Sequence, residues 1–155
     1  MTLTLDIDTP AFAQSIGEII SAVKVPCQAA MASTFATIVH HNFGDDGEDR
    51  PVAWEPLKPG YAHRYHGGDT TPKEVLTGEL QASIEIDEAS DDAASVSTNC
   101  PHARFQHEGG VAELNGHEYT IPPRPVFPIL GNEVTPYTAQ KCLDACAAQL
   151  ERSLA

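Results

Sequence analysis

The sequence predicts an α+β fold in which a long N-terminal helix and a C-terminal helix pack on a small antiparallel β-sheet. Apolar residues recur at three- and four-residue spacing near both ends of the chain, as they do on one face of a helix. Polar and apolar residues alternate in the middle of the chain, which is typical of half-buried strands. The 155 residues suffice for one core, so residues 1–155 are expected to form a single domain.

The N-terminal helix is expected to run from Pro10 to about His41 and to end before Gly44. Pro26 lacks an amide proton, so we expect either a kink there or a break into two helices. The apolar positions that define this helix are Phe12, Ile16, Ile19, Ile20, Val23, Met31, Phe35, Ile38 and Val39.

Residues 43–71 are rich in glycine, proline and aspartate and are expected to form an extended, mobile loop. Trp54, the only tryptophan, would pin this loop to the core or, if exposed, anchor an interface, and the first interpretation is favoured. The acidic residues 45–49 lack the alternating pattern of a calcium loop and are expected to be a solvated loop tip.

A short helix is expected from a capping box at residues 71–74 to about Ala82, continuing through Gly78 with Leu80 facing the core. Residues 83–87 and 93–98 then form an antiparallel hairpin across a turn at 89–92. A helical turn follows over residues 102–107, and residues 111–121 form a second hairpin that turns at Asn115 and Gly116.

Residues 121–127, Ile-Pro-Pro-Arg-Pro-Val-Phe, are a stiff extended segment that holds Arg124, because three prolines exclude a helix interior and a central strand. The last helix is expected to begin after Thr135, its N-cap, with Pro136 in the first turn. Its expected apolar face consists of Ala139, Cys142, Leu143, Cys146 and Leu150.

The formal net charge is −13, from 22 acidic and 9 basic residues. Such a chain repels nucleic acid phosphates and an anionic membrane surface, although it could line a channel through which DNA passes. No stretch approaches the ~20 apolar residues of a transmembrane helix, so a cytoplasmic protein without a membrane partner is expected. The four cysteines lack C-x-x-C spacing and are expected to be reduced and partly buried.

The motifs of common catalytic sites are absent from the sequence, so no enzyme, catalytic residue, cofactor or metal site is expected. The histidines that could favour a metal are His40, His41, His63, His66, His102 and His107. They lack zinc-site spacing, and adjacent histidines on a helix point apart. Two alternatives stay open, a histidine-based metallohydrolase and a soluble adaptor that binds a partner helix through Trp54.

Four segments, in this order, resemble the virion morphogenesis or tail completion proteins of tailed bacteriophages, a family best known from Mu-like phages. The segments are 54–57 (WEPL), 76–84 (LTGELQASI), 96–109 (VSTNCPHARFQHEG) and 121–127 (IPPRPVF). The resemblance spans roughly the last two-thirds of the chain. The sequence departs from the family pattern at three places. His102 replaces a tyrosine, and Gln106 and His107 occupy the positions where the family has histidine followed by glutamine. Glu79 lies where the family often has a basic residue.

This resemblance implies a structural virion protein that forms a homo-oligomeric, six-fold ring in the neck or at the head-proximal end of the tail. It would act in tail completion, tail termination or head-tail joining, after assembly in the host cytoplasm. Its partners would be the tail tube protein and head-tail connector or adaptor proteins, with DNA only passing through an acidic lumen. The candidate interface residues are Trp54, Leu57, Arg64, Tyr65, Arg104, Arg124 and Phe127.

Overall fold

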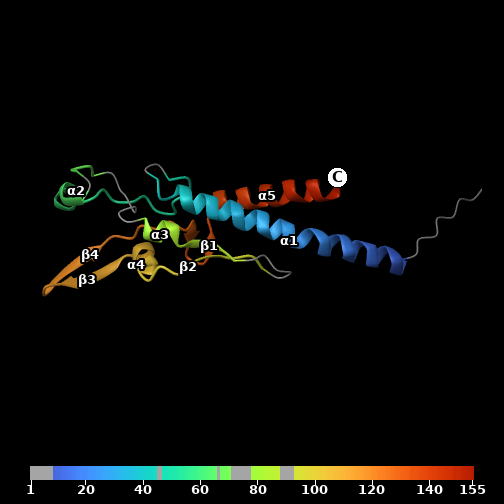
Figure 1. The fold of residues 1–155 in the computed structure, drawn as a ribbon, viewed down its shortest axis with the longest axis horizontal. Helices are drawn as coiled ribbons and strands as arrows, with labels where there is room; N and C mark the ends of the chain where they lie inside the picture. The colour runs from blue at the N-terminus through green and yellow to red at the C-terminus, as the bar shows by residue number, and fades with distance from the viewer. Residues whose placement is uncertain (1–8, 45–46, 66, 71–77, 88–92) are drawn as a thin grey trace, which may run out of the picture.

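One long helix, α1, runs from Thr9 to His41 and forms the axis of the molecule in the computed structural model (Figure 1). The structure describes residues 9–44, 47–65, 67–70, 78–87 and 93–155. α1 continues through Pro26 as a single α-helix, so the expected alternative of two helices is excluded. Pro26 costs α1 one backbone hydrogen bond. α5 packs against α1 at the next residue, Cys27, and this packing supports the helix there.

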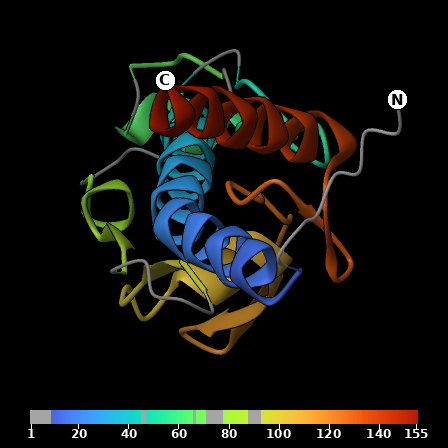
Figure 2. The ribbon, with the colours of Figure 1, turned by 90° about the vertical axis from the view of Figure 1, so that its right-hand side faces the viewer.

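The second long helix, α5, spans Pro136–Leu154 and runs antiparallel to α1. The Cys27 thiol lies 3.5 Å from the carbonyl of Cys146, and the Cys142 thiol lies 3.6 Å from the carbonyl of Met31. Figures 1 and 2 show the helices diverging from this contact toward the N-terminus of α1 and the C-terminus of α5. The expected apolar face of α5 is therefore only partly covered, and Leu143 remains 59% exposed.

By length and composition alone, α1 could cross a membrane over Ala13–His41, so the expectation that no stretch approaches such a span is wrong. A single helix of this kind is weak evidence for a membrane, because core helices and signal sequences share its character. Only 17% of its most apolar stretch is buried within the protein. Much of the apolar surface of α1 is therefore not covered by the described part of the chain.

In the described part of the chain, the strands form three separate antiparallel pairs rather than one sheet. The pairs are β1 (Ile84–Ile86) with β2 (Val96–Thr98), β3 (Gly110–Leu114) with β4 (His117–Ile121), and β5 (Ile129–Leu130) with β6 (Glu133–Val134). The first two confirm the predicted hairpins, and the turn expected at 89–92 lies outside the described residues. Asn115 and Gly116 have φ values of 53° and 75°, as a tight Asn-Gly turn requires.

Among the described residues, three short helices lie between the long helices, α2 (Pro59–Tyr65), α3 (Glu79–Ala82) and α4 (Ala103–Glu108). α4 confirms the predicted helical turn, whereas α2 lies within the segment expected to be an extended loop. Gly78 has a φ of 75° and precedes α3, so the expected helix through Gly78 is wrong. The capping box at residues 71–74 lies outside the described residues.

The main hydrophobic cluster lies around the C-terminal end of α1, where residues distant in the sequence meet. Its buried members are Val39, Phe43, Trp54, Leu80, Cys100 and Val126. Leu80 is 5% exposed, as the sequence predicts. The four cysteines are free thiols, two buried and two partly buried, which agrees with the sequence expectation. This cluster packs the loop after α1 and the proline segment (residues 121–128) against the end of α1.

Candidate assembly site

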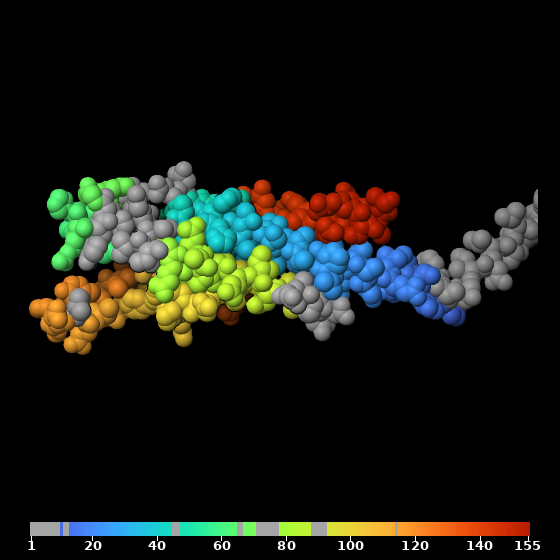
Figure 3. All heavy atoms as spheres, viewed as in Figure 1, coloured from blue at the N-terminus to red at the C-terminus, as the bar shows by residue number. Residues whose placement is uncertain are grey.

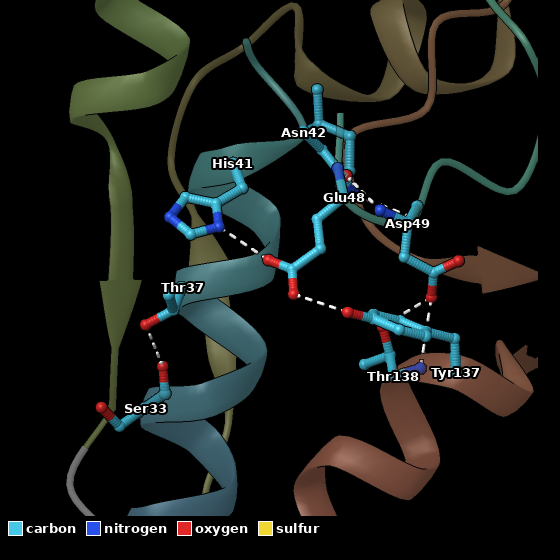
Figure 4. A network of polar contacts seen from close by, with 9 residues as sticks. Ser33, Thr37, His41, Asn42, Glu48, Asp49, Tyr137 and Thr138 are labelled. Atoms are coloured by element: carbon cyan, nitrogen blue, oxygen red, sulfur yellow. Dashed lines mark hydrogen bonds and ion pairs between the residues drawn. The ribbon is translucent and has the colours of Figure 1, made fainter. Parts of the chain in front are cut away.

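Asn42, the residue directly after α1, joins three parts of the chain by its side chain, which is 0% exposed. Its Nδ2 donates hydrogen bonds to the carbonyls of Asp49, at 2.9 Å, and Val126, at 2.8 Å. Its Oδ1 accepts hydrogen bonds from the amides of Glu48, at 3.0 Å, and Asp49, at 2.8 Å (Figure 4). Asn42 therefore ties the end of α1 to the following loop and to the proline segment.

Asp49 caps α5 from this loop, although it lies 89 residues before Thr138. Its carboxylate accepts hydrogen bonds from the Thr138 amide, at 3.2 Å, from the Thr138 hydroxyl, at 2.7 Å, and from the Thr135 hydroxyl. The first amides of a helix lack intrahelical acceptors and favour a negative charge. Thr135 makes no side-chain cap bond of its own, so the expected N-cap side-chain interaction is supplied by Asp49 instead.

Glu48 bridges the end of α1 to the first turn of α5. Its carboxylate lies 2.6 Å from His41 Nδ1 and accepts a 2.8 Å hydrogen bond from the Tyr137 hydroxyl (Figure 4). The hydrogen bonds from His41 and then Tyr137 hold the pKa of Glu48 below its ordinary value, and the bond to Glu48 raises the pKa of Tyr137. Glu48 is exposed, as the expected solvated loop tip at residues 45–49 requires, whereas Asp49 is half-buried, so the expectation is wrong for Asp49.

Glu48→Gln should make stability less dependent on pH in the acid range. Because the folded pKa of Glu48 is lowered, its contribution is present above the ordinary pKa of 4.5 and is lost as pH falls through the folded value. Since the pair is partly exposed, we expect a difference of about 0.2–1 kcal/mol at neutral pH that shrinks in acid. Urea unfolding of both proteins across this range measures it, and a difference that stays constant with pH would contradict the assignment.

Trp54 fixes the loop against the proline segment and is 6% exposed. Its Nε1 donates a 3.2 Å hydrogen bond to the carbonyl of Pro125. The guanidinium carbon of Arg50 lies 3.7 Å from the centroid of the Trp54 ring, and Arg50 Nε donates a 3.0 Å hydrogen bond to the carbonyl of Asn42. This placement favours the interpretation of Trp54 as a residue that pins the loop to the core.

The proline segment is also held from its other side, by α4. The Arg124 amide donates a 2.8 Å hydrogen bond to the carbonyl of Gln106. Gly109, which ends α4, has a φ of 72°, and a Cβ there would lie 2.8 Å from the carbonyl oxygen of Ile121 and from the nitrogen of Pro123. Glycine is therefore required at this close approach. The segment is stiff by composition and is braced on both sides by the fold.

Phe127 lies at the end of this segment and lines an apolar pocket of about 280 Å³ between α1, β2, β5 and α5. Its ring centroid is 6.4 Å from that of Phe35 and 6.1 Å from that of His107. Burial lowers the pKa of His107, which favours the neutral imidazole beside Phe127. The pocket can accept an apolar side chain but offers little for polar chemistry.

The candidate interface residues fall into two groups. Trp54 and Leu57 are buried, at 6% and 3% exposure, while Arg124 and Phe127 are half-buried near the hydrophobic cluster. Trp54 contacts the proline segment, which contains Arg124 and Phe127, whereas Leu57 is buried in the loop before α2.

The second group lies on short helices outside the cluster. Arg64 is exposed on α2, which also contains Tyr65, at the end of the molecule opposite the N-terminus of α1 (Figure 1). Arg104 is exposed on α4, where its Nε lies 3.0 Å from the carboxylate of Glu108. Such an exposed ion pair contributes little to stability. Arg64 and Arg104 both lie at the surface.

Sequence reasoning missed Asn42, Asp49 and Thr138, which connect the two long helices. One signal pointed to such a contact, because the first turn of α5 contains no acidic residue to complement its amides. The identity of the capping carboxylate depends on how the loop folds back, which local patterns do not specify.

No catalytic or metal arrangement emerges from the described residues. Within the described ranges, no three His, Cys, Asp or Glu residues are grouped so that they could hold a metal ion. Cys100 Sγ lies 3.2 Å from His102 Nε2, but Cys100 is only 7% exposed and belongs to the hydrophobic cluster. This thiol is placed for packing rather than for attack on a substrate.

Comparison with known families identifies one match. The sequence model of the phage virion morphogenesis family matches residues 11–151. The matched range includes most of α1, the whole Asn42 network, the proline segment and most of α5. No curated protein and no solved structure matches the chain.

Proposed function

The chain belongs to the phage virion morphogenesis family, and we propose that it forms a ring in the neck or at the head-proximal end of a phage tail. The family match over residues 11–151 carries this proposal, because it assigns the chain a structural or assembly role in a virion. In the proposed ring the chain completes or terminates the tail and joins it to the head. Its proposed neighbours are the tail tube protein and a head-tail connector or adaptor protein.

The net charge of −13 supports a ring through which DNA passes. A lumen lined by carboxylates would not bind phosphates, so DNA could move through it without being held. Six copies would match the symmetry of a tail tube.

The network around Asn42 and Trp54 supports a structural role. It joins α1, the loop, the proline segment and α5 through contacts that are buried or partly buried. A subunit braced in this way can hold its surface residues in a fixed geometry, which an assembly of identical copies requires. Within the described residues, no group that could hold a metal ion favours a metallohydrolase. The adaptor hypothesis requires an exposed Trp54, whereas this side chain is 6% exposed.

Location in the particle tests this proposal directly. Mature particles of the phage that encodes the chain should contain it in the neck or upper tail, as detected by mass spectrometry and by reconstruction of the neck. Deletion of its gene should yield heads and tails that fail to join, and the wild-type gene supplied in trans should restore joined particles. Mature, infectious particles without the chain would refute the proposed function.

Arg124→Ala should leave the protein folded but reduce the yield of joined particles by about 10-fold or more. The proposed reason is the loss of a charge-assisted contact of about 1.5–3 kcal/mol across a subunit boundary. Arg124→Lys keeps the charge but lacks the planar fork, so its yield should be intermediate. Lys58→Ala removes an exposed cation outside the proline segment and serves as a control. Normal particle yield with Arg124→Ala would show that this contact is absent.

A further inference from the structure

The N-terminal half of α1 carries an exposed apolar stripe, formed by Ile16, Ile19 and Ile20 and called here the isoleucine stripe. These side chains are 41%, 46% and 56% exposed. Figure 3 shows this part of α1 projecting beyond α5. At 3.6 residues per turn, Ile16 and Ile20 lie on the same helix face as Cys27, which contacts α5. The isoleucine stripe thus continues the α1–α5 interface past the point where the two helices separate.

A second apolar stripe, called the leucine stripe, lies on α5 and consists of Leu143, Leu150 and Leu154. They are 59%, 37% and 60% exposed, and their spacing of seven and four residues places them along one side of the helix. This side lies next to the face by which Cys142 and Cys146 contact α1. Each copy of the chain therefore presents two different apolar helical surfaces.

The distribution of charge indicates what covers these stripes. Glu18 and Lys24 are the only charged residues of α1, and in α5 Asp144 and Glu151 balance Lys141 and Arg152. The two helices thus have no net formal charge, whereas the chain as a whole carries −13. Copies of the chain repel one another through the rest of their surface, so contact through α1 and α5 has the lowest electrostatic cost.

We infer that the isoleucine stripe of one copy packs on the leucine stripe of the next copy. The contact joins different surfaces, and such a heterologous contact closes into a ring when the rotation between copies allows it. In this contact α1 of one copy packs on α5 of the next copy. The same two helices already pack on each other within each copy. The leucine stripe extends from Leu143 to Leu154, roughly 16 Å along the helix, which is long enough to cover the isoleucine stripe. The inference deepens the proposed function and rests on it only for the closure of a ring.

Two charged double variants test this pairing, Ile16→Glu/Ile20→Glu and Leu143→Glu/Leu154→Glu. Light scattering coupled to gel filtration should show an oligomer for the wild-type chain and the 16.6 kDa monomer for each variant alone. An equimolar mixture should form a dimer and no larger species, because one intact pair of stripes remains between the two variants. Each variant alone should associate at least ten-fold more weakly than the wild type, which corresponds to about 1.4 kcal/mol.

A matched control is Val52→Glu/Val111→Glu, which adds the same charge at residues that are 48% and 61% exposed elsewhere on the surface. It should remain oligomeric like the wild type. Circular dichroism should show unchanged helix content in all three variants, because the substituted side chains are exposed. If a double variant unfolds, Ile20→Glu and Leu154→Glu replace it in the same mixing experiment.

Several results would overturn the inference. A leucine-stripe variant that still oligomerises would indicate contact between isoleucine stripes, and a mixture that stays monomeric would exclude pairing of the two stripes. A monomeric wild-type chain that binds phosphatidylcholine vesicles through Ile16 and Ile20 would assign the isoleucine stripe to a bilayer. The proposed function fails separately: mature particles without the chain would refute it while leaving stripe pairing in solution intact.

Discussion

Asn42→Ala is expected to lower the free energy of unfolding by about 3 kcal/mol or more, because each buried polar group left without a partner costs about 1–3 kcal/mol. The substitution removes the hydrogen-bond partner of the Val126 carbonyl and also releases the backbone of Glu48 and Asp49. The loop would then no longer hold Asp49 at the first turn of α5. We therefore expect the capping of α5 to weaken together with the attachment of the proline segment.

Chemical unfolding followed by circular dichroism measures this loss. Asn42→Asp keeps the acceptor Oδ1 but loses the two Nδ2 donations, so it should also be strongly destabilising. Asn99 is exposed, and Asn99→Ala should change stability by less than about 0.5 kcal/mol. A loss below about 1 kcal/mol for Asn42→Ala would mean that water replaces the side chain and that the network is not buried as described.

Trp54→Ala is expected to cost about 3–5 kcal/mol, the range for deleting a large buried aromatic side chain. The indole is 6% exposed and belongs to the hydrophobic cluster. The substitution therefore leaves a cavity among the other members of the cluster, which include Phe43 and Val126. It also removes the hydrogen bond to the Pro125 carbonyl and the surface on which Arg50 stacks. The loop and the proline segment should separate locally before the rest of the protein unfolds.

The matched variant for this position is Trp54→Phe, which keeps much of the apolar packing but lacks the Nε1 donor. It should lose clearly less stability than Trp54→Ala, and thermal unfolding by circular dichroism compares the two. Hydrogen exchange at the amides of residues 121–127 should accelerate in Trp54→Ala more than exchange in α1. Equal stability of the alanine and phenylalanine variants would place the indole outside the cluster.

The sequence predicted those elements whose signals are local. Helical spacing of apolar residues indicated α1 and α5, and an Asn-Gly pair between alternating residues indicated the β3–β4 hairpin. It missed β5 and β6, because two residues per strand are too few to display alternation. The predicted helix through Gly78 was wrong because this glycine adopts a positive φ, which the interior of a helix does not allow, and α3 begins only after it.

The candidate site was predicted only in part, because only some of its contacts have a local signal in the sequence. The composition of residues 121–127 indicated a stiff segment, and a lone tryptophan in a loop indicated a residue that pins it. Nothing local linked Asn42 to Val126 or Asp49 to Thr138, which lie 84 and 89 residues apart. The pairing of such groups depends on where the chain returns in space.

The sequence by itself therefore determined the two long helices, the rigid proline segment, the charge of −13 and the resemblance to phage virion morphogenesis proteins. These properties follow from composition and short-range spacing, which act within a few residues. The tertiary structure decided that Asp49 caps α5, that Trp54 is buried against Pro125, and that the isoleucine and leucine stripes stay uncovered. Capping partners and burial are set by packing between distant segments, so only the folded chain specifies them.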